Sequence, residues 1–85
     1  MNTIRVLLFA GARDSVGASS VELEVNFPTN TRDLKTALGV RYPSLEAHLN
    51  YGRSAYGNEF IDDDFVIESP NPVCEFALIP PVSGG

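Results

Sequence analysis

The sequence predicts an α+β fold in which one main helix lies across one face of a mixed sheet. Three observations predict it. Two β-type segments, 3–10 and 20–27, begin the chain, a helical pattern covers residues 34–42, and a last β-type segment occupies residues 75–79. Packing one helix against one face of a sheet is the simplest way to bury the apolar sides of both elements. The 85 residues suffice for one core, so we expect a single domain over residues 1–85.

The composition narrows the class of protein. Hydrophobic residues make up 44% of the chain and charged residues 20%, as is typical of a soluble globular protein. The longest apolar runs, residues 6–10 and 76–82, are much shorter than the roughly 20 residues of a membrane-spanning helix. No signal-peptide pattern is visible at the N-terminus, so we expect a cytoplasmic protein. Six basic residues are scattered among eleven acidic ones, which argues against nucleic acid as a direct partner.

The first two strands are predicted from period-two alternation. Residues 3–10 place one set of side chains on one face and a second set on the other. The first set is Ile4, Val6, Leu8 and Ala10, and the second is Arg5, Leu7 and Phe9. Residues 20–27 alternate as cleanly, so we expect them to pair back on the first strand. Gly11 and residues 14–19 between them favour a loop or a hairpin connection.

The main helix is predicted by its spacing and its boundaries. Pro28 ends the second strand, and residues 29–31 (TNT) supply candidate N-caps. Apolar and aromatic positions then recur three and four residues apart up to Tyr42, and Pro43 ends the pattern. Ser44 is a candidate cap for a short second helical turn, which would carry Leu45 and Leu49 toward the core.

The second half of the chain predicts a small hairpin and a final strand. Gly57-Asn58 between two β-favouring dipeptides suggests a tight turn. Residues 62–64 (DDD) invite a cation-binding interpretation, but no further ligands follow at loop spacing, so we favour a solvated acidic turn and no metal site. In residues 75–79, Phe76 and Leu78 share one face. Ala77 and Ile79 share the other face with Glu75.

Neither the single cysteine nor the single histidine indicates a functional site by itself. Cys74 is the only cysteine, which excludes a disulfide within the chain, and we interpret it as a small strand-edge residue. His48 is the only histidine, and we expect it to lie partly exposed on a helical segment.

The chain ends in Pro80-Pro81-Val82-Ser83-Gly84-Gly85, for which the residues alone leave two interpretations. One is an inert, frayed end. The other is a directed arm over residues 80–85. Prolines fix φ and extend the residue before them, while two glycines make a thin tip that can present the terminal carboxylate inside another protein's active site.

Several segments resemble the MoaD family, the small subunit of molybdopterin synthase. They are residues 76–85 (FALIPPVSGG), 4–10 (IRVLLFA) and 31–38 (TRDLKTAL) leading to 41–45 (RYPSL), in the order expected for the family. The family usually carries Gly-Asp-Glu before the last strand, where this chain has Val73-Cys74-Glu75. It often has Asn-Gly in the middle hairpin, where this chain has Gly57-Asn58.

The resemblance to the MoaD/ThiS sulfur carriers implies a ubiquitin-like β-grasp fold and a flexible tail. It implies that Gly85 is adenylated and then becomes a thiocarboxylate, with Gly84 as its conformational and steric partner, and that sulfur passes to cyclic pyranopterin monophosphate. It further implies a chain that is not itself an enzyme and binds no cofactor, because an activating adenylyltransferase (MoeB-like) uses the ATP. The implied second partner is the large catalytic subunit (MoaE-like), in a heterotetramer of two small and two large subunits.

If the fold is a β-grasp, the first and last strands are neighbours. Leu7 and Phe9 would then form one exposed apolar patch together with Ala77 and Ile79. The alternative is that a loop of the same chain covers Leu7 and Phe9. We expect this patch to bind the partner together with Pro80, Pro81 and Val82. Other hypotheses stay open, namely a carrier for thiamine, cysteine or tRNA thiolation, a ubiquitin-like modifier, and an interaction module with an inert tail.

Overall fold

A five-stranded mixed sheet forms the centre of the computed structural model, which describes residues 2–69, 71 and 74–79. The strands, in spatial order, are β2 (Ser20–Val25), β1 (Asn2–Leu8), β7 (Phe76–Ile79), β4 (Arg53–Tyr56) and β5 (Glu59–Ile61). The central strands β1 and β7 are parallel, and every other pair of neighbours is antiparallel. The predicted adjacency of the first and last strands is therefore confirmed.

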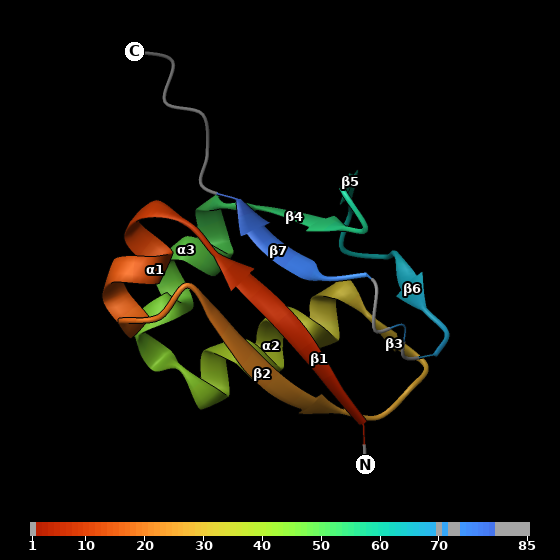
Figure 1. Cartoon of the computed structure of the whole chain (residues 1–85). Helices are drawn as coiled ribbons and strands as arrows, with labels where there is room; N and C mark the ends of the chain where they lie inside the picture. Colours follow the sequence, from red (N-terminus) through yellow and green to blue (C-terminus); the bar gives the residue numbers. More distant parts are fainter. Residues whose placement is uncertain (1, 70, 72–73, 80–85) are drawn as a thin grey trace.

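Helices cover one face of this sheet. Figure 1 shows α2 (Thr31–Arg41) crossing behind the strands, with α1 (Ala10–Val16) and α3 (Glu46–Tyr51) gathered at one end. A 3₁₀ turn, η1 (Pro43–Leu45), joins α2 to α3. The α+β class with one main helix across one sheet face is confirmed. None of the described helices is long and apolar enough to cross a membrane.

The core lies between the sheet and α2, as the alternation predicts. Ile4, Val6 and Leu8 of β1 are buried there, because every second side chain of the strand faces the helix. Leu34 and Leu38, one turn apart on α2, are fully buried against them. Phe76 of β7 is the largest fully buried side chain, so it anchors the central strand to the core.

The connection between β1 and β2 differs from the prediction. The two strands pair antiparallel as expected, but α1 joins them in place of a loop or hairpin turn. Ala10, predicted on the core face of the first strand, is instead the exposed first residue of α1, with φ 49°. Gly17 ends the helix with φ 83°. A helix this short has little stability of its own, so tertiary contacts determine it. Ala12 is buried, and the Ser44 hydroxyl donates to the Ser15 carbonyl oxygen (3.3 Å).

The predicted boundaries of α2 are confirmed, and Asn30 is the N-cap among the three candidates. Its side-chain oxygen accepts a hydrogen bond from the Asp33 N–H (2.8 Å), which satisfies a donor that the first helical turn leaves unpaired. Leu45 and Leu49 are buried as expected. Ser44 lies inside η1 and caps no helix, so that part of the prediction is wrong.

The Gly57-Asn58 turn is confirmed between β4 and β5. Both residues have positive φ (59° and 70°), the conformation of the tight turn that matches strand twist. A second, two-stranded sheet pairs β3 (Thr29–Asn30) with β6 (Val66–Ile67). The sequence indicated only an apolar patch at residues 65–67.

Candidate functional site

The face of the sheet opposite α2 carries three rows of side chains. Register places Leu7 of β1 beside Ala77 of β7, and Ala77 beside Ala55 of β4. Ala55 in turn lies opposite Phe60 of β5, so one apolar row crosses four strands. A charged row lies on one side of it, beginning with Arg5 opposite Glu22. On its other side, Ile79 lies opposite Arg53.

The apolar row forms the floor of a hollow of about 290 Å³. Its lining residues are Leu7, Phe9, Ala55, Gly57, Asn58, Phe60, Glu75, Ala77 and Ile79. All four apolar residues that the strand pattern placed on this face therefore line one hollow. Phe9 is 41% exposed and Phe60 is 59% exposed, whereas Ala77 is buried. Exposed large apolar side chains around a hollow are typical of a surface that another molecule covers.

Ala55 and Phe60 were missed by the sequence analysis, although one signal pointed to them. The Gly57-Asn58 turn fixes the hairpin register, and that register puts Ala55 opposite Phe60. No pattern in the sequence indicates that this hairpin lies beside β7. That neighbour relation comes from the tertiary fold.

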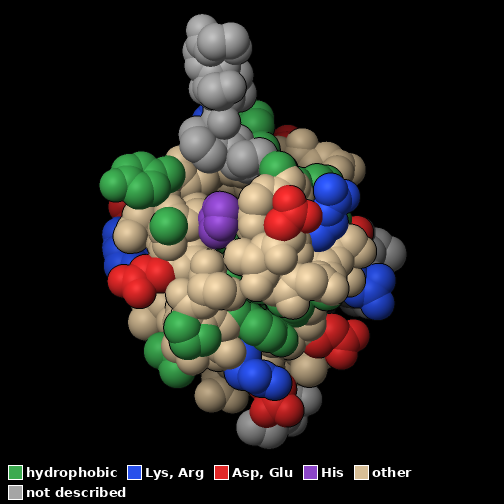
Figure 2. Space-filling view, turned by 90° about the vertical axis from the view of Figure 1, so that its left-hand side faces the viewer, with side chains coloured by type: hydrophobic (Ala, Val, Ile, Leu, Met, Phe, Trp, Pro, Cys, Tyr) green, Lys and Arg blue, Asp and Glu red, His purple; other side chains and the backbone are tan. Residues whose placement is uncertain are grey.

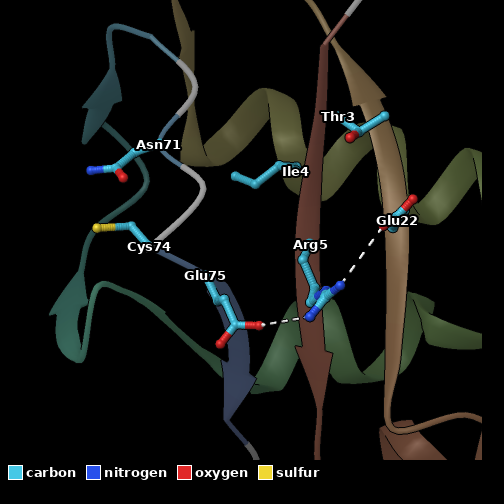
Figure 3. Close-up of a pocket in the computed structure, with 7 residues that line it drawn as sticks. All are labelled: Thr3, Ile4, Arg5, Glu22, Asn71, Cys74 and Glu75. Atoms are coloured by element: carbon cyan, nitrogen blue, oxygen red, sulfur yellow. Dashed lines mark ion pairs between the residues drawn. The ribbon is translucent and has the colours of Figure 1, made fainter.

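Charged side chains border the hollow at the start of β7. Figure 3 shows Arg5 between two carboxylates, with nitrogen-to-oxygen distances of 3.7 Å to Glu75 and 4.0 Å to Glu22. All three side chains are well exposed, so water screens these pairs and each contributes little to stability. Two carboxylates and one guanidinium leave this border with one net negative charge.

Cys74 is half-buried and lies just before β7, at the edge of the last strand as the sequence indicated. A Cβ built on Gly57 would come 3.2 Å from its Sγ, so the thiol packs closely under the β4–β5 turn. The neighbouring Tyr56 points away from the sheet face that is opposite α2, which we call the open face, and packs against the core. Burial, and to a lesser extent Cys74, raises the pKa of the Tyr56 phenol.

His48 lies on α3 and is half-buried, which confirms its prediction as a partly exposed helical residue. Figure 2 shows this histidine, the purple side chain, at the surface of the end of the molecule that faces the viewer. No cluster of Lys and Arg side chains gathers on the face shown there. Gly11 of α1 lies so close to this ring that a Cβ would come 2.8 Å from the His48 Cε1.

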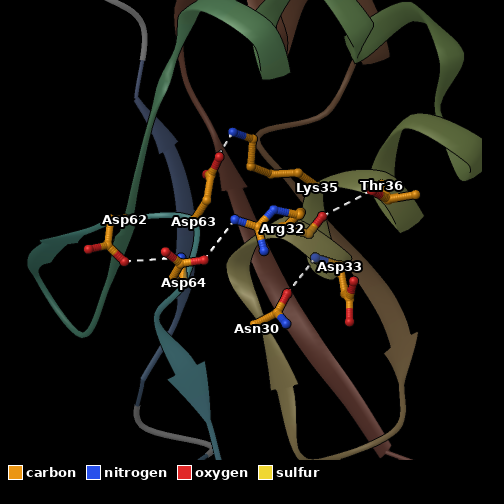
Figure 4. A network of polar contacts seen from close by, with 8 residues as sticks. All are labelled: Asn30, Arg32, Asp33, Lys35, Thr36, Asp62, Asp63 and Asp64. Carbon is orange, nitrogen blue, oxygen red and sulfur yellow. Dashed lines mark hydrogen bonds and ion pairs between the residues drawn. The ribbon is translucent and has the colours of Figure 1, made fainter.

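The acidic run 62–64 is exposed to solvent and also forms ion pairs with α2. Figure 4 shows two of its carboxylates turned toward α2. The Lys35 Nζ donates to Asp63 (3.0 Å) and the Arg32 guanidinium donates to Asp64 (2.7 Å), a bond that raises the pKa of Arg32. The acidic turn is exposed, as predicted. The sequence did not indicate that Arg32 and Lys35, 32 and 28 positions earlier in the chain, pair with it. Within the described ranges, no group of three His, Cys, Asp or Glu residues is placed to hold a metal ion.

Several predicted residues lie outside the part of the chain that the structure describes. They are Val73, where the chain departs from the family pattern, and Pro80, Pro81, Val82, Gly84 and Gly85 of the tail. Ile79, the last described residue, lines the hollow. The chain therefore continues toward its C-terminus from the border of this hollow.

Sequence comparison connects nearly the whole chain to known proteins. The family model described as "ThiS family" matches residues 6–85. The molybdopterin synthase sulfur carrier subunit of Mycosarcoma maydis is 38% identical, over 98% of this chain and 94% of that protein. The protein of the same name from Arabidopsis thaliana is 33% identical, over 96% of this chain and 82% of its own length.

Solved structures agree with the fold. Small archaeal modifier protein 1 of Haloferax volcanii is 25% identical and superposes with a TM-score of 0.79, over 99% of this chain and 100% of that one. This likeness confirms the ubiquitin-like β-grasp that the family resemblance implies. A complex of subunits 1 and 2 of molybdopterin-converting factor from Helicobacter pylori contains a chain that superposes with a TM-score of 0.68 at 19% identity, over 99% of this chain and all of that one.

Proposed function

Because the chain belongs to the ThiS family, we propose that it is the sulfur carrier subunit of a molybdopterin synthase. The observation that carries this proposal is the identity of 33–38%, over almost the full chain, to proteins that bear that name. The Pro-Pro-Val-Ser-Gly-Gly ending supports it, since a carrier needs a thin terminus with a free carboxylate.

The chemistry requires activation of the Gly85 carboxylate. A carboxylate is a poor acyl donor, because its charge repels nucleophiles and it lacks a good leaving group. In the proposed sequence, a carboxylate oxygen attacks the α-phosphate of ATP and pyrophosphate leaves. Sulfide (HS⁻) from the sulfur donor then attacks the carbonyl carbon of the mixed anhydride, AMP leaves and the sulfur loses its proton, so one difficult step becomes two easier ones. The product is a thiocarboxylate that gives its sulfur to cyclic pyranopterin monophosphate.

The proposed roles of Gly84 and Gly85 are steric. An adenylating enzyme has to surround the terminal carbonyl closely, and a Cβ at either position would occupy that space and restrict φ and ψ. The ATP belongs to a MoeB-like adenylyltransferase, and the catalytic side chains belong to the partner. This chain is therefore a non-catalytic donor subunit in the proposal, and it holds no cofactor of its own.

The hollow on the open sheet face is the proposed docking site for a MoaE-like large subunit. Phe9 and Ile79 line it beside the point from which residues 80–85 continue. Six extended residues reach about 20 Å, enough to place a terminus inside a partner whose surface covers the hollow. The Helicobacter pylori complex of two subunits supports a partner of this kind, and we propose a heterotetramer of two small and two large subunits.

Intact-mass measurement tests the carrier role. The protein is incubated with ATP, a MoeB-like activating enzyme and a sulfur donor. We expect a mass increase equal to the replacement of one oxygen by one sulfur, located at the C-terminus. A variant lacking Gly85 is the matched control and should gain nothing. An unchanged mass, with an activating enzyme that thiocarboxylates a known carrier in the same mixture, would refute the proposal.

A second candidate function is a ubiquitin-like modifier joined to lysines through Gly85. The likeness to small archaeal modifier protein 1 favours it, and the activation step is the same. Isopeptide-linked adducts recovered from cells, dependent on Gly85, would support the modifier. Thiocarboxylate carriers for thiamine, cysteine or tRNA thiolation differ only in the acceptor, so supplying each acceptor to the thiocarboxylated protein separates them.

A further inference from the structure

Arg53 is a cation on the open sheet face that rests on an aromatic ring. Its guanidinium carbon lies 4.0 Å from the centre of the Phe60 ring. Among the described residues, Arg53 forms no ion pair, whereas Arg5 on the same face lies between two carboxylates.

The two ends of the hollow therefore carry opposite charges. On the face opposite α2, the side chain of Glu75 just before β7 is followed along β7 by those of Ala77 and Ile79, and Arg53 lies opposite Ile79. The Glu75 end has the Arg5–Glu22 pair as well, with one net negative charge in total. The Ile79 end has the positive charge of Arg53. Complementary charges at the two ends of an apolar patch fix the orientation in which a partner binds.

We infer that Arg53, held by Phe60, binds a carboxylate of the large subunit at the end of the hollow from which the tail continues. The inference rests on the proposed function and adds to it a specificity-determining pair that the sequence did not indicate. A guanidinium presents planar N–H groups that fit a carboxylate with two parallel hydrogen bonds. Stacking on the ring is attractive and holds the group in place before the partner arrives, so less side-chain freedom is lost on binding.

The partner chemistry follows from this arrangement. The occupant presents an apolar side chain to the hollow and an Asp or Glu next to it, on the Arg53 side. A second copy of this chain is disfavoured, because each copy carries a net charge of −5 and like charges repel. The carboxylate fixes the register of the partner, and so directs Gly85 toward a single entrance on it.

The chain offers a matched control for a test of Arg53. Arg41, at the end of α2 on the helix side of the sheet, also lies over an aromatic ring, with its Cζ 5.1 Å from the centre of Tyr42. Arg53→Glu and Arg41→Glu change the net charge equally and each removes one such stack. Binding of both variants and of the wild type to the cognate large subunit is measured by calorimetry and by association kinetics at several salt concentrations.

We expect Arg53→Glu to weaken binding about tenfold or more and to reduce the salt dependence of the association rate, as loss of an attractive rim charge does. Arg41→Glu should stay within about twofold of the wild type, because its side chain lies far from the docking face. Arg53→Gln removes the charge without reversing it, so its affinity for the large subunit should lie between those of Arg53→Glu and Arg41→Glu. It replaces Arg53→Glu in the test if that variant unfolds. Phe60→Leu keeps an apolar side chain and should weaken binding less than Arg53→Glu.

The outcomes separate the two proposals. If the wild type does not bind a large subunit, the proposed function fails and the inference fails with it. If the wild type binds and the Arg53 and Arg41 variants lose affinity equally, or neither loses any, only the inference is overturned. Concentration-dependent self-association of the chain alone, abolished by Arg53→Glu, would assign the surface to a second copy and also overturn it.

Discussion

Gly52 lies directly against the carbonyl oxygen of Ile79. A Cβ at Gly52 would come 3.0 Å from that oxygen and 2.6 Å from the carbonyl oxygen of His48. The φ of Gly52 is −80°, which any residue adopts, so the position requires glycine for space and not for conformation. The end of α3 and the end of β7 meet at this residue, beside the hollow.

We therefore expect Gly52→Ala to destabilise the protein by about 1–3 kcal/mol, as overpacking typically does. Both close atoms belong to the backbone, which yields less readily than a side chain. Urea unfolding followed by circular dichroism measures the loss. Gly39→Ala in α2 is the matched control, because its Cβ would lie 3.4 Å from Leu49 Cδ1 and alanine is the better helix residue by about 0.5–1 kcal/mol. Equal stability of the two variants would contradict this account of Gly52.

Phe9→Ala and Ile79→Ala should each weaken binding to the large subunit while the isolated domain stays folded. Truncation of an anchor at the centre of an interface costs about 1–2 kcal/mol or more, a factor of about 5–30 in affinity. Val40→Ala is the control, since Val40 is 78% exposed on α2, away from the hollow. Calorimetric titration measures the affinities, and thermal unfolding verifies the fold. Affinities equal to that of Val40→Ala would remove the hollow as the docking site.

Asn30→Ala should cost about 1 kcal/mol of stability, with a range of about 0.5–2. The change leaves the Asp33 N–H without the side-chain acceptor that it has now at 2.8 Å. Asn30→Ser is the control, because serine caps a helix about as well. Chemical denaturation distinguishes the two, and an Asn30→Ser variant as unstable as Asn30→Ala would show that the cap is not the cause.

Tyr56→Phe should reduce the loss of stability at alkaline pH. Burial raises the pKa of the Tyr56 phenol, so the folded state keeps the proton to a higher pH than the unfolded chain does. The resulting stability is fully present below the unfolded pKa of about 10 and is lost as the pH rises through the folded value. Unfolding free energies of the wild type and Tyr56→Phe, compared between neutral and alkaline pH, measure this contribution. If the unfolding free energies of the wild type and of Tyr56→Phe change equally between neutral and alkaline pH, burial of the phenol makes no such contribution.

The sequence predicted the elements whose patterns are local. The alternation of Ile4, Val6 and Leu8 indicated the core face of β1, and Gly57-Asn58 indicated the β4–β5 turn. It did not predict α1, because seven residues that contain two turn-favouring serine and glycine positions have no strong helical signal. Nor did it predict the pairing of Asp64 with Arg32, since the two are 32 residues apart and only the fold brings them together.

The candidate site likewise has a part that the sequence predicted and a part that only the fold brings together. By itself, the sequence determined that Leu7 and Phe9 share one strand face, that Ala77 and Ile79 share another, and that the chain ends in two glycines. Only the tertiary structure placed β4 and β5 beside β7, and so added Ala55, Phe60 and Arg53 to the open face. The physical reason is that side-chain alternation depends on the local backbone, whereas strand order depends on which elements together bury the most apolar surface.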